Sequence, residues 1–167
     1  VSILIPAFNA AQTLEATLES CVEQGLDVVA ETIVVDDHSS DNTADVFQRI
    51  ASKHPDFRWR WATNPSKGAC SARNHAFRLS KGAFIQWLDA DDILGPKKLR
   101  RQLDHVHKER NTVITSPFRP FSDHPSTGLI HDTRNWHFSS ENSPAKWLSE
   151  DNMCIPACWL VPRTLAM

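Results

Sequence analysis

Three carboxylates follow an apolar run in the stretch FIQWLDADDILGPKKL, residues 84–99. They belong to Asp89, Asp91 and Asp92, and like charges held this close together repel one another, most strongly where water is excluded. A positive charge is therefore expected beside them. Carboxylate oxygens suit Mg²⁺ or Mn²⁺, and either ion can in turn bridge a diphosphate.

Other polar clusters follow other apolar runs in the same way. They are Pro6, Ala7, Phe8 and Asn9 after residues 1–5, Asp36 and Asp37 after residues 32–35, and Asn64, Lys67, Gly68, Arg73 and Asn74 in and after a third loop. If the runs are parallel strands, their carboxyl ends meet at one edge of a sheet, where open α/β sheets bind ligands. Asp37 can accept a hydrogen bond from a base or a ribose, while Arg73 and Lys67 can approach a phosphate or a ring edge. Together these clusters predict a site for a nucleotide and a metal ion.

The elements that must position these residues alternate along the first 115 residues. Periodicity and turn residues predict strands at 1–5, 32–35, 57–62, 83–88 and 111–115, and helices at 9–25, 43–52, 69–80 and 96–108. Asn9 is the expected N-cap of the first helix, Gly25 its expected end, and Pro96 the expected first residue of the last helix. This alternation predicts an α/β fold with a mostly parallel, Rossmann-like sheet flanked by helices. Residues 116–142 suggest a long loop with a hairpin near 128–138, followed by a helix at 144–150 and a final strand at 154–161.

Composition excludes several classes of protein. The chain has 167 residues, enough for one domain with a core, and its formal charge of −2 (18 basic and 20 acidic residues) argues against a general nucleic-acid binder. No apolar run is long enough to predict a transmembrane helix. Cys21, Cys70, Cys154 and Cys158 suggest no disulfide framework, so a reducing, cytoplasmic compartment is expected. Cys154 and Cys158 have a loose zinc-like spacing, but buried thiols are the favoured interpretation.

Several of the polar residues have a plainer interpretation. Asp36, Asp37 or Asp41 can cap the helix near residue 43, and Asp92 can cap the helix near residue 96. Arg73 can be an ordinary exposed helix residue. The basic run at 97–101 is best interpreted as a solvated helix face, with a membrane surface or an anionic acceptor as the alternative.

Four motifs in order carry a family resemblance: VSILIPAFNAAQTLEATLES, IVVDDHSSDNT, NPSKGACSARNHAF and FIQWLDADDILGPKKL. With them the chain resembles a family-two glycosyltransferase of the GT-A fold. The resemblance is specific over residues 1–103 and looser over 104–167, where PACWLVPRTLAM carries it. It marks residues 1–115 as the nucleotide-sugar-binding half and residues 116–167 as a partial acceptor-side region of the same domain.

The resemblance implies an inverting transferase that uses a nucleotide-diphosphate sugar, usually a UDP-sugar, with Mn²⁺ or Mg²⁺. Its motif positions imply a nucleoside pocket at Pro6, Ala7 and Phe8, a base contact at Asp37, phosphate or base contacts at Lys67 and Arg73, a ribose or sugar contact at Asp91, and a metal ligand at Asp92, with Asp89 as a weaker candidate. The acceptor would be a hydroxyl of a polysaccharide, glycolipid or glycan, and peripheral contact with the inner membrane is left open.

The catalytic base of the resembled family is an Asp or Glu downstream of the PACWLVPRTL-like strand, and it is expected beyond Met167. Glu150 and Asp151 precede that strand and do not match. The alternative is therefore a nucleotide- and metal-binding module without turnover, either a fragment or a degenerate paralogue. No glycine-rich phosphate loop follows the first strand, which argues against a nucleotidyltransferase or a dinucleotide-binding oxidoreductase.

Overall fold

A mostly parallel sheet forms the centre of the fold. The computed structural model describes residues 1–106, 112–121 and 156–166. In these ranges the strands are β1 (Ser2–Ala7), β2 (Glu31–Asp36), β3 (Trp59–Thr63), β4 (Phe84–Trp87) and β5 (Leu160–Pro162), in the order β3-β2-β1-β4-β5. The first four strands run parallel, and β5 is antiparallel to β4. The predicted α/β class is confirmed.

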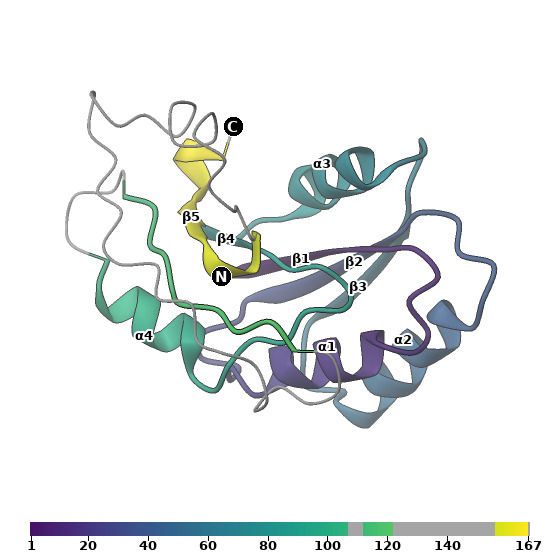
Figure 1. Cartoon of the computed structure of the whole chain (residues 1–167), viewed down its shortest axis with the longest axis horizontal. Coiled ribbons are helices and arrows are strands. Elements are labelled where there is room, and N and C mark those ends of the chain that lie inside the picture. Colours follow the sequence, from purple (N-terminus) through teal and green to yellow (C-terminus); the bar gives the residue numbers. More distant parts are fainter. Residues whose placement is uncertain (107–111, 122–155, 167) are drawn as a thin grey trace.

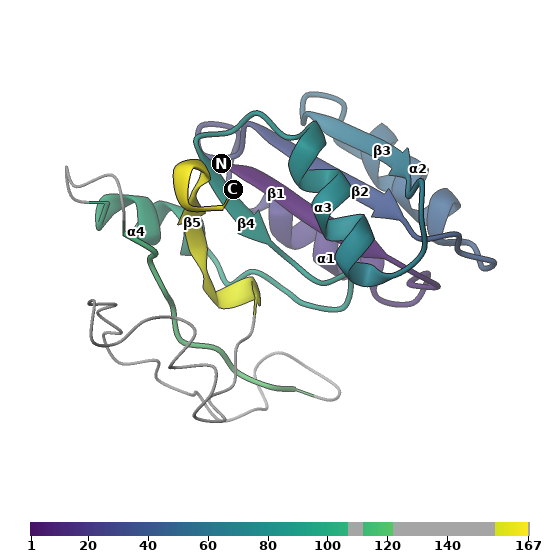
Figure 2. The ribbon, with the colours of Figure 1, turned by 90° about the horizontal axis from the view of Figure 1, so that it is seen from above.

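Helices cover both faces of this sheet. They are α1 (Leu14–Val22), α2 (Thr43–Lys53), α3 (Ala69–Leu79) and α4 (Lys98–Asp104), with short 3₁₀ turns η1 (Pro156–Cys158) and η2 (Arg163–Leu165). Figure 1 shows α1, α2 and α4 on one side of the sheet and α3 on the other, and Figure 2 shows α3 lying over β1 and β2. None of the described helices is long and apolar enough to cross a membrane.

The residues of β1 explain why the strand is apolar throughout. Ile3 and Ile5 are fully buried in the core that includes Leu18 of α1, while Leu4 is fully buried against Ala72 of α3 on the opposite face. A parallel strand covered on both faces needs apolar residues at successive positions. This buried strand holds Pro6, Ala7 and the residues after them at a fixed place on the sheet edge.

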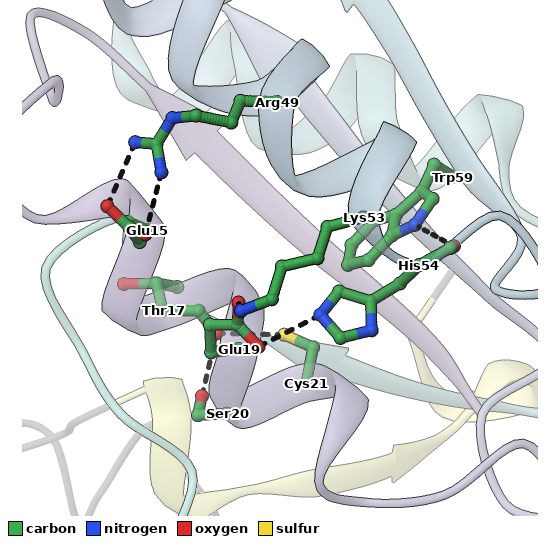
Figure 3. A network of polar contacts seen from close by, with 9 residues as sticks. All are labelled: Glu15, Thr17, Glu19, Ser20, Cys21, Arg49, Lys53, His54 and Trp59. Carbon is green, nitrogen blue, oxygen red and sulfur yellow. Dashed lines mark hydrogen bonds and ion pairs between the residues drawn. The ribbon is translucent and has the colours of Figure 1, made fainter.

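Ion pairs join α1 to α2 on the outer surface. Arg49 binds Glu15 through both terminal nitrogens at 2.7 and 2.9 Å, and Glu19 contacts Lys53 at 2.7 Å and His54 at 3.0 Å (Figure 3). Each exposed pair contributes little by itself, because water and salt screen its charges. Together they join the outer surfaces of α1 and α2.

Two predicted helix starts were wrong. Asn9 does not cap α1, because its φ of 49° is left-handed and the helix begins at Leu14 with Thr13 as its N-cap. Pro96 does not begin α4, because Lys97 also has a left-handed φ, of 57°, so the helix begins at Lys98. Gly25, with a φ of 91°, lies just after the end of α1, as predicted.

The expected strand at 111–115 is also wrong over its described residues. Ile114 pairs with Leu160 in one isolated bridge. The Ser116 N–H also donates to the Cys158 carbonyl at 3.0 Å, but no strand forms, because residues 156–158 opposite coil into η1 instead of the strand expected from residue 154. The hairpin at 128–138, the helix at 144–150 and Cys154 lie outside the described residues. Cys158 is a buried free thiol.

A polar network around Lys98 ties η1 and Ile114 to the rest of the fold. The Lys98 Nζ donates to Gln86 Oε1 at 2.7 Å and to Gln102 Oε1 at 2.8 Å. Gln86 in turn donates to the carbonyl of Ala157, and Gln102 donates to the carbonyls of Ile114 and Cys158. The Lys98 ammonium is buried more deeply than the side chain as a whole, and this burial lowers its pKa to about 7.

Candidate functional site

A cavity of about 490 Å³ opens at the carboxyl edge of β1, β2 and β4. Six of the predicted donor-binding residues line it: Pro6, Ala7, Phe8, Asp37, Arg73 and Asp91. Asp89 also lines it, whereas Lys67 and Asp92 are not among its lining residues. The strand order explains this convergence, because parallel strands present all of their carboxyl ends to one edge.

Phe8 forms an exposed apolar wall of the cavity. It follows β1 directly, and 61% of its surface is accessible although it lines the cavity. A large ring held open at the edge of a polar cavity offers a flat surface on which a planar base can stack.

Asp37 stands on the loop after β2 and is held by the loop before α3. Its carboxylate accepts hydrogen bonds from Asn64 Nδ2 at 2.6 Å and from the Gly68 N–H at 3.0 and 2.8 Å. The hydrogen bond from Asn64 is the main cause, and the Gly68 N–H a further cause, of a pKa for Asp37 that lies below its usual value. Asp37 is therefore an ionised acceptor at neutral pH, and it lines the cavity.

Asn64 and Gly68 are the residues that orient Asp37. Asn64 is 1% exposed, and its side-chain oxygen accepts a hydrogen bond from Ser71. Gly68 has a φ of 104°, a conformation that favours glycine. The sequence places both residues in the right loop but gives no sign that they bind a carboxylate 27 and 31 residues away.

Arg73 pairs with one of the three clustered carboxylates. Its Nη2 lies 2.5 Å from Asp89 Oδ1, and both side chains line the cavity. The Arg73 Nε is buried without a hydrogen-bond partner. Arg73 is thus not an ordinary exposed helix residue, and Asp89 directs its guanidinium along the cavity.

The other two carboxylates follow on a tight turn. β4 ends at Trp87, and the Asp92 N–H donates to the Asp89 carbonyl at 3.1 Å. The strand therefore ends before Asp89, and the alternation of side chains along β4 does not extend to the three carboxylates. Burial, and then the charges of Asp89 and Asp91, raise the pKa of Asp92 to about 6. Asp91 lines the cavity, and Asp92 lies next to it along the chain.

Charge on this turn is only partly offset by the protein. Among the described residues, the ion pairs include Asp89 but neither Asp91 nor Asp92. The same part of the chain contains no group of three or more His, Cys, Asp or Glu side chains arranged to hold a metal ion. The donor set is hard oxygen, which suits Mg²⁺ or Mn²⁺, but a cation here needs further ligands from a bound anion.

Comparison with known proteins decides the family. The family described as "Glycosyl transferase family 2" matches residues 2–167. The chain belongs to this family. It is 37% identical over 136 residues to a chondroitin synthase of Escherichia coli, covering 81% of this chain and 19% of that protein. It is 36% identical over 130 residues to the E. coli UDP-Glc:alpha-D-GlcNAc-diphosphoundecaprenol beta-1,3-glucosyltransferase WfaP, covering 78% of this chain and 50% of that protein. The family-two chain thus spans half or less of the length of these relatives.

A solved structure shares the family-two fold. Residues 1–349 of TarS from S. aureus, in complex with UDP, align with a TM-score of 0.77 and 18% identity. The alignment covers 98% of this chain and 47% of that one. The fold is GT-A, as the four sequence motifs predicted.

Proposed function

We propose that this glycosyltransferase domain binds a UDP-sugar in the cavity at the carboxyl edge of the sheet and transfers its sugar, with inversion, to a hydroxyl acceptor. The observation that carries the proposal is the convergence of Phe8, Asp37 and the Arg73–Asp89 pair on one cavity. The UDP-Glc named for the relative WfaP supports a uridine donor. The acceptor proposed from the same relative is a hydroxyl of a lipid-linked or polymeric glycan.

Each residue has a part that follows from its chemistry. Asp37 accepts a hydrogen bond from the base, which stacks beside Phe8. Arg73 faces the diphosphate, because it lines the cavity and a guanidinium is suited to binding anionic phosphate oxygens. Lys67 adds positive charge near Asp37, and its field contributes to the lowered pKa of that carboxyl.

We further propose that Asp91 and Asp92 take part in holding Mn²⁺ or Mg²⁺ together with the donor diphosphate. Their oxygens are suitable ligands, and no described ion pair offsets their charges. When bound, such an ion neutralises charge on the leaving diphosphate. Asp89 is kept from this role because Arg73 occupies it.

The proposed reaction is a single displacement at the anomeric carbon, in which the acceptor hydroxyl attacks as the nucleoside diphosphate leaves. We assign its base to none of the described residues. The cavity residues bind and orient the donor, and the attacking hydroxyl must come from the side opposite the diphosphate.

The test is turnover of a panel of UDP-sugars by the full-length protein, with the configuration of the product read by NMR. The Asp37→Asn variant should lower kcat/KM about tenfold or more, because it removes a charged acceptor. Asp56→Asn is the matched control, since Asp56 is an exposed residue before β3, at the opposite end of the strands. A product with retained configuration, or equal kcat/KM for both variants, would contradict the proposal.

A further inference from the structure

Two loops form adjoining walls of the cavity and are hydrogen-bonded to each other. One loop carries Phe8 from β1 into α1, and the other carries Asp37 from β2 into α2. The Asn9 N–H donates to Ser39 Oγ at 2.9 Å, and the Ser40 N–H donates to Asn9 Oδ1 at 2.8 Å. The base-binding residues of the proposed function therefore stand on segments that are cross-linked by side chains.

The centre of this cross-link is the pair Thr43 and Asp41. Thr43 Oγ1 accepts the Ala10 N–H at 2.9 Å and donates its own proton to Asp41 Oδ1. The other oxygen of Asp41 accepts the Ala11 N–H at 3.0 Å. One hydroxyl and one carboxylate thus satisfy two successive backbone N–H groups of the opposite loop.

Thr43 is the buried member of this pair, and Asp41 is the exposed one. Thr43 is fully buried, so removing its hydroxyl leaves the Ala10 N–H without an acceptor where water does not reach. Asp41 lines the cavity. Asp41 caps α2 as predicted, because its Oδ1 also accepts the Thr43 N–H at 3.1 Å, and its other carboxylate oxygen binds the opposite loop.

The helices themselves have other contacts that hold them together. Ion pairs join Glu15 and Glu19 of α1 to Arg49 and Lys53 of α2 and to His54 just after it (Figure 3). The inner faces of both helices share the buried core. The Thr43–Asp41 contacts lie at the start of α2, and Asp41 lines the same cavity as Phe8 and Asp37. These contacts therefore act on the loops and not on the helices. They bind residues 10 and 11, just after Asn9, whose left-handed φ turns the chain away from Phe8.

We propose that Thr43, supported by Asp41, is a positioning residue for the donor: it fixes the Phe8 loop against the Asp37 loop at the separation that a nucleoside base requires. This inference rests on the proposed function, since it assumes that the base lies between these two loops. Thr43 touches no substrate. It acts through the backbone of residues 10 and 11, and hence through the placement of Phe8.

The test compares Thr43→Val, which keeps the shape of the side chain but loses the hydroxyl, with Thr43→Ser, which keeps the hydroxyl. UDP affinity of the full-length protein is measured by calorimetry. Thr43→Val should bind UDP about tenfold more weakly, because the Phe8 loop then leaves the position that UDP binding must restore, and restoring it leaves one N–H unsatisfied. Thr43→Ser should stay within about twofold of wild type. Equal binding by wild type and Thr43→Val would overturn the inference alone. Absence of UDP binding by wild type would overturn the proposed function together with it.

A double-mutant cycle separates positioning from general destabilisation. If Thr43 acts through Phe8, Thr43→Val should cost little further affinity once Phe8→Ala has removed the ring. Full additivity of the two losses would contradict positioning. Should Thr43→Val fail to fold, the exposed Asp41→Asn substitution replaces it in the cycle. Asp41→Asn should weaken UDP binding in the wild-type background but not in the Phe8→Ala background.

Discussion

Lys98 gives the stability of the fold a dependence on pH that one variant can isolate. Its ammonium is buried between the side-chain oxygens of Gln86 and Gln102, and burial lowers its pKa from 10.5 to about 7. The weaker influence of Cys158 acts in the opposite direction. The unfolded chain therefore holds the Lys98 proton over a pH range in which the folded chain has released it.

This difference in bound protons sets the direction in which stability changes with pH. Between pH 7 and 10.5 the unfolded state binds more protons, so the contribution of Lys98 to the free energy of unfolding rises with pH. The limiting slope for one proton is about 1.4 kcal/mol per pH unit. Across two pH units near the middle of this window, the contribution should grow by at most about 3 kcal/mol.

The assay is urea unfolding of wild type and Lys98→Met at pH 7.5 and 9.5, monitored by circular dichroism. Other titrating groups contribute equally to both proteins, so the difference between them should increase with pH in favour of wild type. Lys97→Met is the matched control, because Lys97 is exposed and should leave the pH slope unchanged. A constant difference between wild type and Lys98→Met across this range would refute the buried-amine argument.

Three further predictions test the site and the core. Asp92→Asn should lose most of the metal-dependent part of UDP binding, and equal affinity for wild type and variant at saturating Mn²⁺ would remove Asp92 from the proposed metal site. Arg73→Gln and Asp89→Asn should each weaken UDP binding severalfold, and the double variant should be little worse than either, because the two side chains act as one pair; additive losses in calorimetry would contradict this. Leu4→Ala should lower the free energy of unfolding by about 2–5 kcal/mol, since Leu4 of β1 is fully buried against α3. A smaller loss, measured by urea unfolding, would show that neighbouring side chains fill the space that the leucine leaves.

The strands could be predicted because a parallel strand that is buried on both faces is a continuous run of apolar residues. β1 and β2 are runs of branched apolar residues, and each leads at once into residues that reach the cavity. Asp37, Arg73 and Asp91 could be placed in one site from the sequence, because the loops after parallel strands all lie at the same edge of the sheet.

The features that escaped prediction depend on contacts between distant segments or on single backbone angles. Asn64 binds Asp37 across 27 residues and Arg73 binds Asp89 across 16, and no local pattern announces either pair. Asn9 and Lys97 adopt left-handed angles where helix-start signals suggested regular turns. The side chains of Asp91 and Asp92 could not be assigned by strand alternation, because β4 ends at Trp87.

We propose above all that the cavity binds a nucleoside diphosphate through Asp37 with help from a divalent cation. The most direct measurement is calorimetric titration of UDP into wild type and Asp37→Asn, first with Mn²⁺ and then with EDTA, with GDP and dTDP as comparison ligands. Micromolar binding of UDP that collapses in EDTA, and that is weaker in Asp37→Asn under both conditions, is the predicted result. Folded wild-type protein that binds none of the three nucleotides, or an Asp37→Asn variant that binds UDP as tightly as wild type, would contradict it.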